Sequence, residues 1–244
     1  MPYRSELSEA TLCAHPVANT HTHTVMPDTL RTPIVPHQEE LSNPYGMDTD
    51  CQHCPALVGC RERVVHGYGD AEAEILFLGD APTAGAERTG VPFTGDEVGR
   101  RIQRVLGELG LSRSPPDADD PELQNVYTTY LTRCRHPERP STVEEQRNCE
   151  PFLNAEARMI NPELIVPVGQ RALEALAIEY TTRSPDSFDA DAEHATTVRG
   201  RGFELLPMKA LEDLTDADAD RFVEHVRENV FSRDYRQTKG RRSR

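Results

Sequence analysis

Four cysteines are the residues of this chain whose spacing most clearly predicts chemistry. Cys51 and Cys54 form a Cys-x-x-Cys pair, and Cys134 and Cys149 follow as two single residues. A close pair and two distant cysteines can converge on one inorganic centre, and both zinc and a [4Fe–4S] cluster take four thiolate ligands. We expect these cysteines to bind metal, because six cysteines in an intracellular chain of 244 residues are more typical of ligands than of disulfides.

The segments that must position these cysteines alternate between strand and helix patterns. Short buried apolar runs predict strands, and apolar residues spaced three and four apart predict the helix after each strand. The predicted strands are 74–79, 126–131, 164–168 and 203–206, and the helical patterns cover 98–109, 142–160, 172–176 and 215–230. Such units predict an α/β fold of three layers, α/β/α, with a central, mostly parallel four-stranded sheet. Residues 184–199 are polar and acidic, and we expect an exposed connection there.

Ligands of parallel sheets bind where the strands reach their carboxyl ends. In this chain those ends are residues 79–82, 130–135, 168–169 and 206–207. Cys134 lies in one of these segments. The sequence therefore predicts a metal centre beside the ligand-binding edge of the sheet.

The cysteine spacing and its neighbouring segments resemble the uracil-DNA glycosylase superfamily, in particular its iron–sulfur families four and five. The similar features are the Cys51-x-x-Cys54 pair, the Cys134-x14-Cys149 spacing, the segment 61–69 and the run Cys134-Arg135-x-Pro137. The resemblance covers about residues 51–230. It implies that the metal is a [4Fe–4S] cluster rather than zinc and that the partner is DNA containing uracil or another deaminated base.

The resemblance also implies a pocket for a base rotated out of the DNA helix. The segment formed by Gly79, Asp80, Ala81 and Pro82 resembles the family's first motif, whose turn presents backbone groups to the base. Phe93, in a run similar to family five, matches the phenylalanine that stacks on the base. Such an aromatic surface offsets part of the stacking energy that base extrusion costs. The alternative interpretation of Phe93 is a phenylalanine that packs in the hydrophobic core.

Two positions depart from the family pattern. Tyr130 stands where family four has the asparagine that contacts the base edge, and a phenol cannot reproduce the paired donor and acceptor of an amide. Leu206 stands where we expect the histidine that faces the uracil. Loss of one such donor typically lowers the rate about 100- to 1,000-fold. His136 is a substitute only if this loop histidine faces the pocket.

Two aspartates are the candidate catalytic residues that the resemblance implies. Glycosidic cleavage needs a carboxylate near the sugar, to orient water and balance positive charge. Asp80 is the first candidate because of its place in the first motif, and Asp96 of the Thr-Gly-Asp run is the second. The alternative for Asp96 is a cap of the helix that begins near Gly95.

The composition predicts a salt-rich environment. The chain has 41 acidic and 27 basic residues, for a formal net charge of -14, and nearly all its cations are arginine. Dense carboxylates hold water while salt screens their repulsion, so we expect a halophilic, haloarchaeal source. Because DNA binding depends on local charge, the basic residues at 233–244 and Arg133, Arg135 and Arg139 remain candidates for phosphate contacts.

The pattern along the chain predicts three segments. Residues 1–46 are rich in proline, threonine and histidine without strand or helix periodicity, and we expect a disordered extension. Residues 47–232 form the glycosylase-like domain, and 233–244 a basic tail. No apolar run is long enough to span a bilayer and no secretion signal is present, so we expect a cytoplasmic monomer without a membrane partner.

Two functional hypotheses follow. The first is a base-excision repair protein that hydrolyses the N-glycosidic bond of uracil, or a related deaminated base, in DNA. The second is an iron–sulfur nucleic-acid-binding protein of the same fold with weak or no catalysis, which Tyr130 and Leu206 favour.

Overall fold

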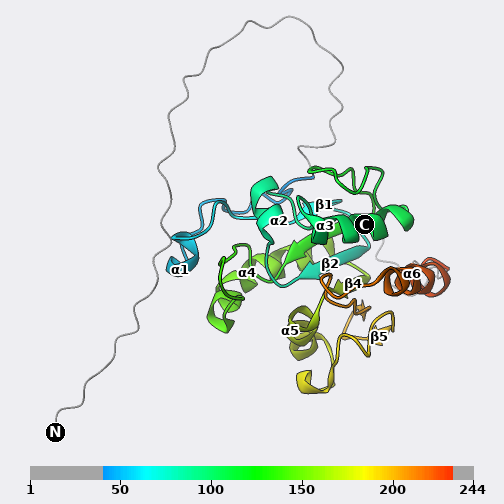
Figure 1. Ribbon diagram of the computed structural model, residues 1–244. Coiled ribbons are helices and arrows are strands. Elements are labelled where there is room, and N and C mark those ends of the chain that lie inside the picture. Colours follow the sequence, from blue (N-terminus) through cyan, green and yellow to red (C-terminus); the bar gives the residue numbers. More distant parts are fainter. Residues whose placement is uncertain (1–40, 233–244) are drawn as a thin grey trace, which may run out of the picture.

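A computed structural model describes residues 41–232, and these form a central sheet covered by helices (Figure 1). The helices are α1 (Pro55–Val58), α2 (Ala84–Thr89), α3 (Glu97–Glu108), α4 (Val143–Ile160), α5 (Gln170–Tyr180) and α6 (Asp216–His225), with a 3-10 turn η1 (Pro185–Ser187) and a π-helical turn η2 (Val226–Val230). The strands are β1 (Tyr68–Gly69), β2 (Ile75–Gly79), β3 (Val126–Tyr130), β4 (Leu164–Pro167), β5 (Val198–Arg199) and β6 (Glu204–Leu205).

The sheet has the order β1-β3-β2-β4-β6-β5. The four predicted strands are β3, β2, β4 and β6, and they pair in parallel as predicted. The two edge strands β1 and β5 are antiparallel and were not predicted. Each has only two residues, too few for an alternating pattern to be recognised in the sequence.

Alternate residues of the strands face the two helical layers. Phe77 of β2 packs in one apolar cluster with residues of α3 and α6, whereas Leu76 and Leu78 pack in a second cluster with residues of α5. Figure 1 shows α3 and α5 on opposite sides of the sheet. The predicted three-layer α/β/α architecture is confirmed.

Two segments differ from the sequence interpretation. Residues 184–199 are not simply an exposed connection, because Phe188, Ala190 and His194 are buried and β5 lies at the end of this segment. Residues 41–46, assigned above to the N-terminal extension, contact the edge of the sheet: Leu41 is buried and Ser42 pairs with Tyr68. The rest of that extension, and the basic tail 233–244, lie outside the described residues.

Helix ends close to the ligand edge are capped by side chains. Thr142 and Glu145 form the predicted capping box at the start of α4, and Thr215 and Asp218 form another at the start of α6. These caps fix where α4 and α6 begin.

Within residues 41–232, no helix combines the length and the apolar character that crossing a bilayer requires.

Candidate functional site

A cavity of about 460 Å³ opens where the parallel strands end. Its wall comes from the segments after β2, β3 and β4, from Phe93, and from residues 210–212 beyond β6. Of the predicted pocket residues, the following line the cavity: Gly79, Asp80, Ala81, Pro82, Phe93 and Tyr130. The edge of the sheet predicted from the sequence is therefore the edge at which the cavity lies.

Phe93 and Tyr130 form one aromatic wall of this cavity. Their ring centroids are 4.8 Å apart, and both side chains are almost fully buried. The Tyr130 hydroxyl accepts a hydrogen bond from the Phe93 backbone N–H at 2.8 Å, and burial raises the pKa of this phenol far above its ordinary value. Tyr130 is therefore a neutral, fixed part of the wall.

The backbone at Phe93 is held in an unusual conformation. Its φ is 57°, in the left-handed region that a bulky residue rarely adopts. Tyr130 holds its N–H, and the buried Gln103 side chain donates to its carbonyl at 3.2 Å. Gly79 makes room for this arrangement, because a Cβ there would lie 2.8 Å from the Tyr130 ring and 2.9 Å from the Phe93 ring.

Asp80 lies in the cavity wall with each carboxylate oxygen engaged. Its Oδ2 is 2.7 Å from Nε of Arg171, the second residue of α5. Its Oδ1 accepts hydrogen bonds from the Ser141 hydroxyl at 2.9 Å and from the Gln146 amide at 3.2 Å. Asp80 is thus an oriented carboxylate that is only partly exposed.

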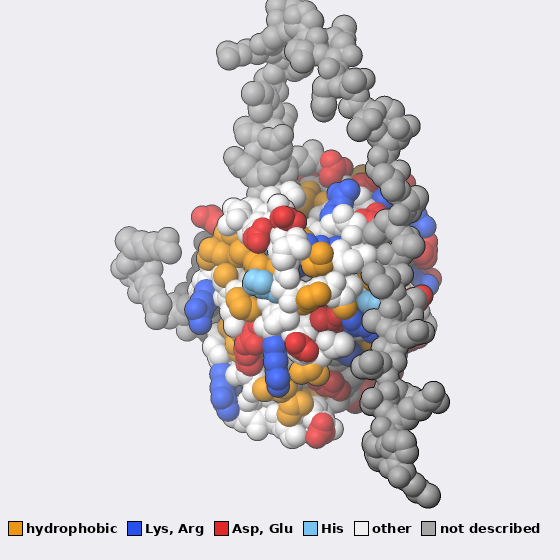
Figure 2. All heavy atoms as spheres, turned by 90° about the vertical axis from the view of Figure 1, so that its left-hand side faces the viewer, with side chains coloured by type: hydrophobic (Ala, Val, Ile, Leu, Met, Phe, Trp, Pro, Cys, Tyr) orange, Lys and Arg blue, Asp and Glu red, His pale blue; other side chains and the backbone are white. Residues whose placement is uncertain are grey.

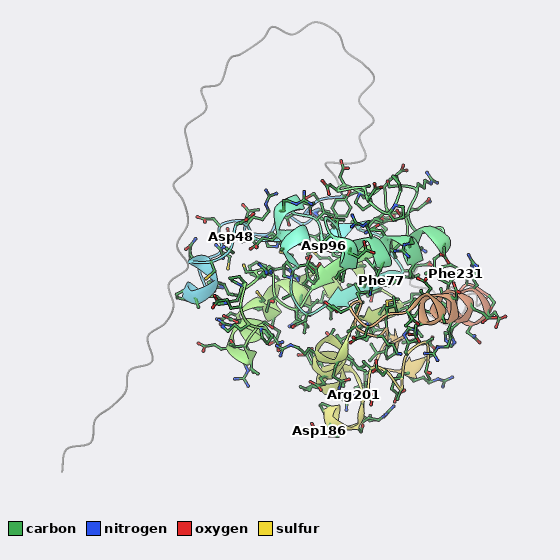
Figure 3. The ribbon with its side chains drawn as sticks, in the orientation of Figure 1. Asp48, Phe77, Asp96, Asp186, Arg201 and Phe231 are labelled. Carbon is green, nitrogen blue, oxygen red and sulfur yellow. The ribbon has the colours of Figure 1, made fainter. Side chains whose placement is uncertain are left out.

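Asp96 has a different environment. Its Oδ1 accepts the Gly99 N–H at 2.8 Å as the cap of α3, and its Oδ2 accepts the Gly85 N–H at 3.1 Å and the Thr83 hydroxyl. Figure 3 shows Asp96 where α2 and α3 approach each other. Asp96 is not part of the cavity lining, so its position favours the capping alternative.

The end of β6 corrects the interpretation of Leu206. Leu206 is fully buried in the apolar cluster that includes α3 and α6, and it does not line the cavity. The residues that reach the cavity from this part of the chain are Ala210, Leu211 and Glu212. From this part of the chain, residues 210–212 therefore form the cavity wall, four to six positions beyond Leu206.

The four predicted metal ligands lie together although they come from distant parts of the sequence. Cys51, Cys54, Cys134 and Cys149 are buried, form no disulfide, and line one small cavity beside α1 and α4. Nitrogen donors face three of the sulfurs: Arg61 Nη1 lies 3.4 Å from Cys134 Sγ, the Arg133 N–H 3.5 Å from Cys149 Sγ, and Asn148 Nδ2 3.5 Å from Cys54 Sγ.

The charge state of these thiols depends on burial. Burial raises the pKa of the Cys134 thiol to about 11, against the opposing effect of Arg61, and burial also raises the pKa of Cys149. Such thiols become thiolates only with a strong positive charge nearby. Among residues 41–232, no three His, Cys, Asp or Glu side chains are close enough to hold a single metal ion.

The position of Arg133 contradicts its interpretation above as a candidate for phosphate contacts. It does not face DNA, because it is 1% exposed and forms an ion pair of 2.5 Å with the equally buried Glu156 of α4. Glu156 also accepts hydrogen bonds from Tyr127 and Thr129 of β3. Arg133 further donates to the Tyr130 carbonyl, so this pair connects the aromatic wall with the helix that carries Cys149.

Sequence reasoning missed three residues that interact with Asp80. Ser141 and Arg171 line the cavity, whereas Gln146 lies outside its lining. Ser141 precedes the capping threonine of α4, and Arg171 follows the glycine at the end of β4. The position of Arg171 just after a strand end was the one signal in the sequence that could have identified it as a site residue. Its contact with Asp80 depends on the pairing of β2 with β4.

Comparisons with known proteins agree with this arrangement. The family model described as "Uracil DNA glycosylase superfamily" matches residues 66–224. The chain is similar to a type-5 uracil-DNA glycosylase of Thermus thermophilus, with 40% identity over 156 residues (55% of this chain and 71% of the relative). It is also similar to a type-5 uracil-DNA glycosylase of Pyrobaculum aerophilum, with 33% identity (52% and 65%), and to a type-4 uracil-DNA glycosylase of Thermotoga maritima, with 36% identity (50% and 58%).

Proposed function

Because the chain belongs to the uracil DNA glycosylase superfamily, we propose that it removes uracil, or a related deaminated base, from DNA by hydrolysing the N-glycosidic bond. The observation that carries this proposal is the cavity at the sheet edge, which combines an aromatic wall with an oriented carboxylate. Its volume of about 460 Å³ falls within the range of small-molecule pockets. The product is an abasic site, the start of base-excision repair.

In this proposal the base enters the cavity by rotating out of the DNA helix. Phe93 and Tyr130 offer the aromatic surface that offsets the lost stacking. The backbone of residues 79–82 lies beside them in the wall. The rings are packed against each other, and hydrogen bonds hold the Tyr130 hydroxyl and the Phe93 backbone, so the surface is formed before the base arrives.

Asp80 performs the carboxylate role. As the C1′–N1 bond breaks, its electron pair stays on the base and positive charge develops on the sugar. The carboxylate stabilises this charge and orients a water molecule. The water oxygen forms a bond to C1′. The proton that the water loses passes to solvent, and the departing base finally takes up a proton. Ser141 and Gln146 fix the carboxylate through Oδ1.

The four cysteines hold a [4Fe–4S] cluster. A single zinc ion would need sulfurs about 2.3 Å from the metal and hence almost in contact with one another, whereas a cluster offers each thiolate its own iron. The cysteine spacing, which resembles that of the iron–sulfur families four and five, supports the cluster over zinc. The donors from Arg61, Arg133 and Asn148 fit the sulfurs of metal-bound thiolates. When bound, the cluster pins the loop around Cys134 beside the cavity.

The DNA strand lies along the cavity mouth, where Arg135 and Arg139 are in the lining. Figure 2 shows that on the face beside α1 and α4 basic and acidic side chains are interspersed, so the net charge of -14 does not make this face uniformly acidic.

We further propose that the protein works in a salt-rich, haloarchaeal cytoplasm and that it is a monomer. A salt titration of DNA binding and sedimentation at molar salt test these two points.

The decisive experiment measures excision of uracil from single- and double-stranded oligonucleotides in high salt. We expect abasic sites with the unaltered protein and at least a 100-fold lower rate with Asp80→Asn, which keeps the shape of the side chain and removes its charge. Glu122→Gln, a surface change far from the cavity lining, is the matched control and keeps the full rate. DNA binding without any cleavage would overturn the proposal in favour of a non-catalytic binding protein.

A further inference from the structure

The cavity needs a group that stabilises the negative charge of the departing base, and most of its wall cannot supply one. The side chains of Ala210 and Leu211 carry no hydrogen-bond donor, and the Glu212 carboxylate is an acceptor. The amide of Gln170 is already engaged: its nitrogen donates to Glu174 at 2.8 Å and to the Phe188 carbonyl, and its oxygen accepts the Ala190 N–H.

The basic side chains of the lining are Arg135, His136, Arg139 and Arg171. Arg139 is occupied, because both of its terminal nitrogens donate to the carboxylate of Glu145, at 2.8 and 2.6 Å. The hydrogen bond from Arg139 lowers the pKa of the Glu145 carboxyl, so the Arg139–Glu145 pair stays charged. Arg135 lies in the loop at the cavity mouth, with its Nη1 3.8 Å from Oε2 of Glu87.

Arg171 is both held in place and open toward the cavity. Its Nε lies 2.7 Å from Asp80 Oδ2, and its Nη2 donates to the hydroxyl of Ser141 at 2.9 Å and to the Ser141 carbonyl. Its Nη1 makes no hydrogen bond to any residue within 41–232. With 41% of the side chain exposed, this nitrogen remains available to a ligand in the cavity.

We propose that Arg171 is a catalytic residue of this chain that donates a hydrogen bond and positive charge to a carbonyl oxygen of the departing base. This inference rests on the proposed glycosylase function and names the group that replaces the histidine absent from the end of β6. The base becomes an anion only as the C1′–N1 bond breaks, so a guanidinium at its oxygen binds more strongly in the transition state than in the ground state. Asp80 and Ser141 hold the guanidinium in position beforehand.

The test compares two leaving groups. Single-turnover excision is measured for uracil and for 5-fluorouracil in otherwise identical oligonucleotides, with the unaltered protein and with Arg171→Ala. We expect a loss of about 100-fold for uracil and a loss of only about 10-fold for 5-fluorouracil, because fluorine already stabilises the anion that the arginine would stabilise. Equal losses for the two bases would overturn the assignment, since a structural or DNA-positioning role does not depend on the leaving group.

Matched variants separate the remaining explanations. Arg135→Ala removes the same charge from the same cavity, and we expect equal losses for the two bases. Arg171→Lys keeps the cation and retains part of the uracil rate. If His136→Ala, and not Arg171→Ala, shows the larger loss for uracil, the donor is His136 and the inference is wrong. An unaltered protein that excises neither base would refute the proposed function together with the inference, whereas active protein with equal losses refutes the inference alone.

Discussion

At the scale of single residues, the two candidate aspartates have different surroundings although both follow family motifs. Asp80 lies in the cavity wall with an arginine, a hydroxyl and an amide around its carboxylate. Asp96 accepts hydrogen bonds from Gly99, Gly85 and Thr83, which join the starts of α2 and α3. Asp80 therefore has the place in the cavity that the proposed catalytic role requires, whereas Asp96 caps α3 outside the cavity lining.

Asp96→Ala tests this division. We expect it to lower the free energy of unfolding by about 1–2 kcal/mol, as for other lost helix caps, and to reduce excision at 25 °C much less than Asp80→Asn does. Urea unfolding and single-turnover excision measure the two effects. Thr215→Ala, which removes the cap of α6 outside the cavity lining, is the control for a comparable loss of stability. A rate loss for Asp96→Ala as large as that for Asp80→Asn would restore Asp96 as a catalytic candidate.

Gly79 illustrates how one missing side chain shapes the pocket. We expect Gly79→Ala to displace the rings of Tyr130 and Phe93, because the added Cβ would lie within 2.9 Å of both. Backbone and rings are tightly packed there, so base binding should fall at least 10-fold, measured as KM for a uracil oligonucleotide.

Gly107→Ala is the matched control for that change. Gly107 lies in α3 and a Cβ there meets nothing within 4 Å, so alanine should raise stability by up to about 1 kcal/mol through helix propensity and leave KM unchanged. Equal KM values for the two variants would show that the aromatic wall does not form the base site.

At the scale of elements, the Arg133–Glu156 pair joins β3, α4 and the aromatic wall. Gly67, Tyr127 and Thr129 donate hydrogen bonds to Glu156, as Arg133 does. Arg133 also donates to the Tyr130 carbonyl. Both side chains are 1% exposed, so neither charge can be solvated if its partner is lost. A buried pair of this kind is costly to break.

Glu156→Gln is expected to lower the free energy of unfolding by about 3–5 kcal/mol, because it leaves the Arg133 charge buried without a carboxylate. The corresponding change at the surface, Glu122→Gln, breaks an exposed pair with Arg113 and should cost less than about 1 kcal/mol. Urea denaturation at constant salt compares them. Similar values for the two variants would mean that the buried charge is not as isolated as the structure indicates.

At the scale of the whole molecule, the cysteine cavity ties the segment before the sheet to the loop after β3 and to α4. Cys51 and Cys54 come from the first of these, Cys134 from the second and Cys149 from the third. Because residues so distant in sequence share one cavity, binding of the proposed cluster would contribute directly to folding.

Cys134→Ser should therefore lower both iron content and thermal stability. We expect anaerobically purified protein to contain iron and inorganic sulfide, and the variant to lose most of both and to unfold at a lower temperature. Iron and sulfide analysis with calorimetry measures this. Zinc in place of iron in the unaltered protein, at one ion per chain, would contradict the cluster.

The amino-acid sequence by itself determined the four parallel strands and the helices that follow them, the ligand edge of the sheet and the four cysteines. Each depends on local information: apolar runs, periodic spacing and motifs of a few residues. Tertiary structure alone decided that Arg133 is buried, that Asp96 lies outside the cavity lining, that residues 210–212 rather than Leu206 reach the cavity, and that Arg171 holds Asp80. These facts depend on how side chains from separate strands and helices pack against one another, and no pattern within a single segment records which distant residue it will contact.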